Sequence, residues 1–194
     1  DDGARGNYGL KEKDVNLDIA LRMKSYLTTR FKHLSGGIQV EMTRENDTFL
    51  TLGERVDIAK RMQADIFFCV HTNSSRANRF NADGFETYYP RQKETISFSA
   101  PKIASEGNDD NVAKENEEAV FQIVDELNET SVIEESRILA EMVQEQLAER
   151  LICPDRGAKS ANFYVLKYTP MISVLVEVGF ICNPNIEANL RDPE

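Results

Sequence analysis

Residues 66–71 read Ile66-Phe67-Phe68-Cys69-Val70-His71, a run of five apolar residues that ends in a histidine. A strand that is apolar on both faces is typical of a sheet that helices cover on each side. Residues 173–178 form a second such run, nearly all of it aliphatic or β-branched. Helical patterns alternate with these strands. The alternation predicts an α/β fold: a single domain with a twisted, mostly parallel sheet and helices on both faces.

The other elements follow from hydrophobic periodicity and from capping signals. We expect a helix over 14–29, a strand over 38–42, and a helix that begins after Thr51, because Thr51 and Glu54 have capping-box spacing. The further expected elements are strands over 84–89 and 162–167, helices over 112–127 and 138–147, and a final helix with Asn183 as its N-cap and Pro184 in its first turn.

The composition excludes several classes of protein. A chain of 194 residues is long enough for one domain with a substantial core. No run approaches the roughly 20 apolar residues of a transmembrane helix. The net charge is -10, and residues 106–135 carry all of it, with eleven acidic residues against one lysine. A nucleic-acid partner is therefore excluded, since such proteins gather Lys and Arg on one face. Three scattered cysteines exclude a disulfide scaffold.

Two polar residues interrupt or end the apolar strands. His71 closes the first run, and Glu177 lies inside the second. In α/β sheets, sites form beyond the carboxyl ends of the strands, so both residues are candidates for chemistry. For His71 the alternative is a hydrogen bond to a neighbouring loop. For Glu177 the alternatives are an ion pair with an arginine such as Arg156 and a general base with a raised pKa, because burial penalises the carboxylate.

Glu12 has a simple explanation of its own, since an acidic residue in the first turn of a helix is favoured by the helix dipole. The chain contains none of the motifs HExxH, GxSxG, GxGxxG or a P-loop. Its two histidines cannot build a three-histidine zinc site. From these residues alone, the sequence favours a hydrolase-like domain with a His/Glu site.

Seven blocks in one order give a resemblance to a known family. They are EKDVNL at 12–17, TR at 43–44 with Asp47, LGERVDIA at 52–59, AD at 64–65 with HTNS at 71–74, GFETYY at 84–89, RG at 156–157 with ANFYVL at 161–166, and VEVGFI at 176–181 with NP at 183–184. In these blocks the chain resembles the zinc-dependent N-acetylmuramoyl-L-alanine amidases of bacterial cell walls, over residues 1–194 except 90–135.

The resemblance implies roles for individual residues. Glu12 and His71 match two ligands of a single Zn²⁺, and Glu177 matches the general base. The first zinc histidine of the family is expected upstream of Asp1, together with a strand whose loss would expose a sheet edge. Asn73 and Arg156 are candidates for substrate binding. A catalytic zinc site keeps one position open for water, which agrees with this ligand set.

Residues 90–135 resemble the regulatory insertion of the amidases that separate daughter cells. In those enzymes a helix lies across the zinc site until an activator protein displaces it. Candidates for a carboxylate that blocks the metal are Glu115, Glu117 and Glu118, since a carboxylate can take the open position. The alternative is a solvated acidic surface segment.

The predicted function is therefore hydrolysis of the amide between N-acetylmuramic acid and L-alanine in peptidoglycan, for cell-wall remodelling or daughter-cell separation. That substrate implies a periplasmic or extracellular location. The alternatives are a non-catalytic peptidoglycan-binding domain that lacks a complete zinc site, and an unrelated metal-dependent peptidase.

Overall fold

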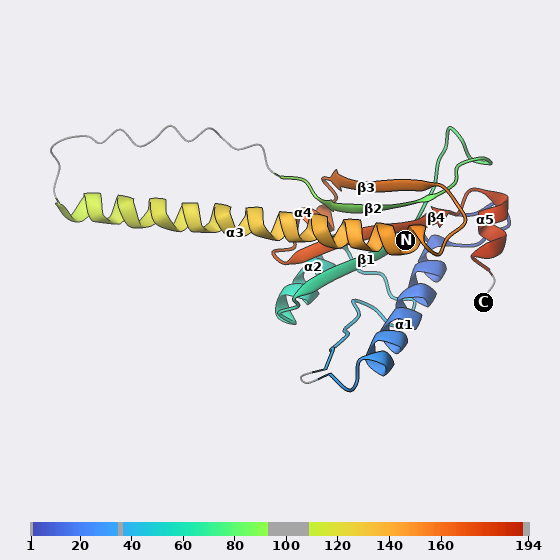
Figure 1. The fold of residues 1–194 in the computed structure, drawn as a ribbon, viewed down its shortest axis with the longest axis horizontal. Coiled ribbons are helices and arrows are strands. Elements are labelled where there is room, and N and C mark those ends of the chain that lie inside the picture. The colour runs from blue at the N-terminus through green and yellow to red at the C-terminus, as the bar shows by residue number, and fades with distance from the viewer. Residues whose placement is uncertain (1, 35–36, 93–108, 192–194) are drawn as a thin grey trace.

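The computed structural model describes residues 2–34, 37–92 and 109–191, with the side chains of 109–123 outside that description. Figure 1 shows the arrangement of the elements. The helices are α1 (Glu12–Arg30), α2 (Leu52–Arg61), α3 (Asp109–Ala148), α4 (Tyr164–Tyr168) and α5 (Pro184–Asn189). The strands are β1 (Ile66–Asn73), β2 (Phe85–Pro90), β3 (Asp155–Ala161) and β4 (Ile172–Phe180).

The four strands form one mixed sheet in the order β1-β4-β2-β3. β1 runs parallel to β4 and β2 parallel to β3, and the two pairs meet where β2 and β4 are antiparallel. Two of the three pairings are thus parallel, and the predicted single-domain α/β architecture is confirmed. In the described residues no helix is long and apolar enough to cross a membrane.

The two faces of the sheet carry different helices. α2 and α4 pack on one face around an apolar cluster of Val56, Ala59, Phe67, Cys69, Val165, Leu166 and Leu175. We call this the α2/α4 face. The C-terminal half of α3 packs against β2, β3 and β4. The side-chain amide of Gln144 in α3 accepts a hydrogen bond from Thr87 of β2 at 2.8 Å and donates one to the Phe85 carbonyl at 3.2 Å.

Two predicted strands are wrong. Residues 38–42 alternate in polarity but form no strand, and three of the five are exposed; nothing in the described residues pairs with them. Residues 164–168 form α4 instead, and Val165 and Leu166 enter the core from one helical turn. A short apolar run fits a helix as well as a strand. The strand in this region, β3, precedes α4 and has a polar sequence that periodicity does not detect.

The two predicted acidic helices are a single helix, α3, of 40 residues. No Gly or Pro separates them, and ion pairs within the helix reinforce the junction, since Arg137 pairs with Glu134 at 2.6 Å and Glu141 at 2.5 Å. At 1.5 Å per residue the helix is about 60 Å long. Its N-terminal half extends beyond the sheet, toward the end of the molecule away from the start of α1 (Figure 1).

β1 lies at an edge of the sheet, and Ile66 and Phe68 are 49% and 36% exposed. The cysteines Cys69, Cys153 and Cys182 are all free.

Gln144 offers a test of how α3 is attached. We expect Gln144→Ala to lower the free energy of unfolding by about 2 kcal/mol, because the buried Thr87 hydroxyl and Phe85 carbonyl lose partners. Gln146→Ala, an exposed glutamine of the same helix, is the control and should change stability by less than about 0.5 kcal/mol. Urea denaturation measures both. Equal effects would show that α3 is not held through Gln144.

Candidate active site

Three ionisable residues on neighbouring strands form a row across the α2/α4 face. His71 of β1 pairs in register with Glu177 of β4, and Glu177 pairs in register with Glu86 of β2. Adjacent strands are about 4.8 Å apart, so the three side chains leave the sheet side by side. We call His71, Glu177 and Glu86 the polar row.

Glu12 reaches the end of this row from the first turn of α1. Its Oε1 lies 2.7 Å from Nδ1 of His71, across 59 positions in the sequence. Its Oε2 accepts a hydrogen bond from the Ala4 amide at 2.8 Å. The structure therefore brings together Glu12 and His71, the two residues that the resemblance predicts as ligands of one metal.

The segment before α1 is anchored by a buried acid at the other end of the chain. Glu187 of α5 is fully buried and accepts hydrogen bonds from the amides of Tyr8 at 2.9 Å and Leu10 at 3.1 Å. Burial alone would raise the pKa of this carboxyl, but these bonds hold it below the ordinary value. Gly6 leaves the room for it, because a Cβ there would lie 2.1 Å from the Glu187 carboxyl carbon. This anchor fixes the chain that leads into Glu12.

The Glu12–His71 contact favours the charged forms of both partners. Burial opposes the charge on Glu12, yet hydrogen bonds from His71 and the Ala4 amide lower its pKa. Burial also opposes the charge on His71, but hydrogen bonds with Cys69 and Glu12 raise the pKa of the imidazole. The pair is thus electrostatically matched, with an anionic oxygen against an imidazole nitrogen.

Glu177 is in the opposite situation. Its Oε2 is buried without a hydrogen-bond partner in the described part of the chain. Its pKa is raised to about 7: burial is the largest cause, the charges of Glu12 and Glu86 add to it, and the charge of His71 opposes it. The suggested ion pair with Arg156 is wrong, because Arg156 binds Glu86 instead. The general-base interpretation agrees with this environment, since a base near pKa 7 works best at neutral pH.

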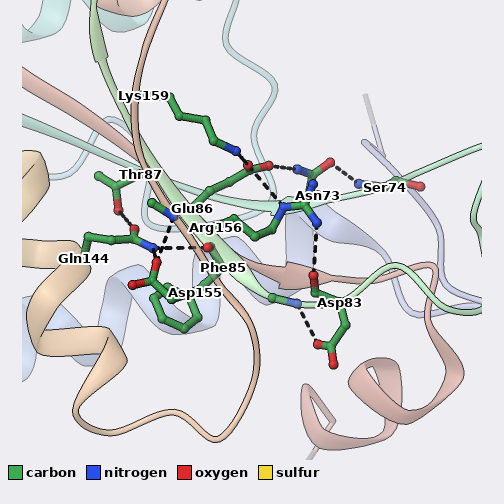
Figure 2. A network of polar contacts seen from close by, with 12 residues as sticks. Asn73, Ser74, Asp83, Phe85, Glu86, Thr87, Gln144, Asp155, Arg156 and Lys159 are labelled. Atoms are coloured by element: carbon green, nitrogen blue, oxygen red, sulfur yellow. Dashed lines mark hydrogen bonds and ion pairs between the residues drawn. The ribbon is translucent and has the colours of Figure 1, made fainter.

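Glu86 is a site residue that the sequence analysis did not single out. It is 3% exposed, and its carboxylate accepts hydrogen bonds from Asn73 at 2.6 Å, Lys159 at 2.5 Å and Arg156 at 3.3 Å (Figure 2). The signal was present: an acid inside the apolar block GFETYY needs compensation just as Glu177 does. Asn73 and Arg156, the predicted substrate-binding residues, thus lie together around Glu86.

The donor set is chemically suited to zinc, which binds imidazole nitrogen and carboxylate oxygen. Among the described residues, however, no group of three His, Cys, Asp or Glu side chains is arranged to hold a metal. Glu12 and His71 supply two donors. Glu115, Glu117 and Glu118 lie in α3, and their side chains fall outside the described residues.

A buried carboxyl with an unpartnered oxygen lies beside a carboxylate–imidazole pair on an α/β sheet, an arrangement that suits a hydrolase. The comparisons make this specific. The sequence model of one family, described as N-acetylmuramoyl-L-alanine amidase, matches residues 1–194. The chain therefore belongs to the N-acetylmuramoyl-L-alanine amidase family, and the family predicted from the sequence is confirmed.

Individual relatives agree with the family. The chain is 37% identical over 191 residues to the amidase LytC of Bacillus subtilis, covering 98% of this chain and 29% of LytC. It is 31% identical to the amidase AmiA of Escherichia coli, covering 96% of this chain and 64% of AmiA. Among solved structures, AmiC2 of Nostoc punctiforme is 26% identical with a TM-score of 0.68, covering 100% of this chain and 80% of that one. The chain thus spans part of the length of these relatives.

The raised pKa of Glu177 predicts a pH-dependent stability. Between its ordinary pKa of 4.5 and about 7 the unfolded chain loses this proton while the folded protein keeps it, so stability falls as pH rises. In metal-free protein we therefore expect Glu177→Gln to be more stable than the wild type by about 2 kcal/mol at pH 8, and equal to it near pH 4.

Thermal unfolding across this pH range measures the difference. Glu145→Gln, on the exposed side of α3, is the control and should give no such pH-dependent gain. If Glu177→Gln follows the wild type at every pH, the carboxyl at 177 is not strained by burial.

Proposed function

We propose that this chain is the catalytic domain of a zinc-dependent N-acetylmuramoyl-L-alanine amidase, which hydrolyses the amide between N-acetylmuramic acid and L-alanine in peptidoglycan. The observation that supports it most directly is the 2.7 Å contact of Glu12 with His71, next to Glu177 and its unpartnered oxygen. Family membership supports the same reaction.

In this proposal Glu12 and His71 would hold the zinc, with a histidine upstream of Asp1 as the third donor. The chemistry that zinc would supply there is a lowered pKa for water and a polarised scissile carbonyl. The folded chain already holds Glu12 and His71 in contact through α1 and β1, so metal binding does not need to bring the two side chains together.

Glu177 acts as the general base. It takes a proton from the water that attacks the carbonyl carbon, and it then passes a proton to the nitrogen of L-alanine as the carbon–nitrogen bond breaks. Burial keeps this carboxyl ready for the task, since its pKa of about 7 allows it both to accept and to donate a proton at neutral pH. Asn73 and Arg156, which both bind Glu86 on the neighbouring strand, would orient the substrate.

Replacing the base separates metal binding from catalysis. In the full-length protein we expect Glu177→Gln to keep about one zinc per chain and to lose about 10²- to 10⁴-fold in the rate of release of stem peptides from purified sacculi. His71→Ala should lose both the zinc and the activity. Elemental analysis and chromatography of the products measure the two quantities. Unchanged turnover in Glu177→Gln would refute its role as base.

A second candidate function is a non-catalytic peptidoglycan-binding domain. It is favoured by one observation: the described residues provide two metal donors rather than three. The full-length wild type decides between the two functions. Zinc together with free intact stem peptides supports the amidase, and sacculus binding without zinc or cleavage supports the second candidate.

A cell-wall substrate places the protein outside the cytoplasm, in the periplasm or beyond the cell. There it would serve cell-wall remodelling or daughter-cell separation.

We further propose that the acidic insertion over residues 90–135 inhibits the enzyme until an activator protein displaces it. Its negative charge supports this role. Blocking would require a different position of α3, because the projecting half of α3 is directed away from the start of α1 (Figure 1).

Deleting residues 95–130 tests the inhibition. The deletion spares Ser136, Ala140 and Gln144, which are the buried contacts of α3 with the sheet. If the insertion blocks the site, the basal rate on sacculi should rise severalfold while the melting temperature stays near that of the wild type. An equal or lower rate in the folded variant would favour a solvated surface segment.

A further inference from the structure

Two cations beside the proposed site share one buried partner. Arg156 and Lys159 of β3 both bind the carboxylate of Glu86, and each of their side chains is 41% exposed. Figure 2 shows them converging on Glu86 from β3, with Asn73 on the other side of the carboxylate. We call Arg156 and Lys159 the basic pair.

The charge of this cluster is not balanced. Burial opposes the ionisation of Glu86, but Lys159, Tyr88 and Arg156 together lower its pKa, so it carries one negative charge. Two cations face it, which leaves one positive charge at the surface of a chain whose net charge is -10. Within the described residues Lys159 forms one ion pair, and an ammonium has three donors. The cluster is therefore able to accept a further anion.

The guanidinium of Arg156 is also held in a fixed position. It donates to the Asp83 carbonyl at 3.3 Å and lies 5.0 Å from the centre of the Phe180 ring. Fixed donors lose less conformational entropy when they bind a ligand than free side chains do. The basic pair thus has the properties of a prepared anion site rather than of two solvated surface cations.

The position of the basic pair selects the part of the substrate that it meets. β3 lies two strands from β4, so the backbone at Arg156 is about 10 Å from that of Glu177. An extended peptide advances at most about 3.5 Å per residue. A chain whose first residue is at the scissile bond therefore reaches the basic pair with its second or third residue.

We propose that the basic pair binds a carboxylate on the second or third residue of the stem peptide and makes the enzyme prefer the free acid over the amide. This inference rests on the proposed amidase function. The second residue, a D-glutamate linked through its γ-carboxyl, has an α-carboxyl that is either free or amidated. The third residue offers a carboxylate when the peptide ends there.

Three soluble substrates distinguish these sources. The first is N-acetylmuramoyl-L-Ala-γ-D-Glu-L-Lys amide, whose only free carboxylate is on D-Glu. The second is its D-isoglutamine analogue, which is amidated at both positions. The third is the D-isoglutamine analogue whose only free carboxylate is at the C-terminus. In the full-length enzyme we expect kcat/KM to be about tenfold higher for one of the acids than for the doubly amidated peptide, as for a charge-assisted hydrogen bond. The basic pair binds the carboxylate whose amidation removes the preference, on either the second or the third residue.

The variants test whether the basic pair is responsible. Lys159→Gln should reduce the preference to about threefold, and Lys159→Glu should abolish it, because the charge falls in steps. Lys60→Gln, an exposed lysine of α2, is the matched control and should keep the whole preference. Equal rates for the three substrates in the wild type, or an unchanged preference in Lys159→Glu, would overturn the proposal.

A binding measurement separates this inference from the proposed function. Titration calorimetry of this chain with the free peptide L-Ala-γ-D-Glu-L-Lys and its doubly amidated analogue needs no hydrolysis. Tighter binding of the acid, lost in Lys159→Glu, supports the anion site even if no amide is cleaved. Cleavage of all three substrates without any preference supports the amidase and refutes the anion site.

Discussion

The contact between Glu12 and His71 joins the start of α1 to the end of β1, and the proposed site depends on it. Each residue has an ordinary explanation in its local sequence, the helix dipole for Glu12 and a hydrogen bond to a loop for His71. They become a candidate site because Oε1 of Glu12 lies 2.7 Å from Nδ1 of His71. The anchoring of the preceding segment by Glu187 and the position of His71 next to Glu177 both serve this one contact. Separating α1 from β1 would leave two isolated polar groups rather than a site.

Glu86 and Glu177 lie side by side on neighbouring strands, but the pKa of one is lowered and that of the other is raised. Glu86 is surrounded by donors, and they lower its pKa despite burial. Glu177 has one oxygen without a partner, and burial raises its pKa to about 7. The same sheet therefore stabilises one charge and opposes another a single strand away. Divergent environments for paired acids are a common way to divide structural and catalytic roles.

The sequence was sufficient for the fold class and for the two apolar strands β1 and β4, because apolar runs such as 66–70 favour burial. His71 and Glu177 were candidates from their places in the apolar strands, whereas Glu12 became a candidate only through the resemblance. The sequence failed for β3, whose polar residues become a strand by pairing with β2, and for 38–42, where alternation found no partner. The block GFETYY marks Glu86 as an acid that needs compensation, but its partners Lys159 and Arg156 lie about 70 positions away. Such long-range pairing has no local signal.

The two faces of β2 have a consequence for how this site can change. Glu86 is part of the polar row on one face, and its neighbour Thr87 contacts Gln144 of α3 on the other face. A shift of β2 by one residue would exchange these positions, placing the Thr87 hydroxyl in the polar row and the Glu86 carboxylate against α3. The C-terminal half of α3, through Gln144, thus helps to fix the register of β2. The segment around Gln144 and the polar row are therefore coupled through β2.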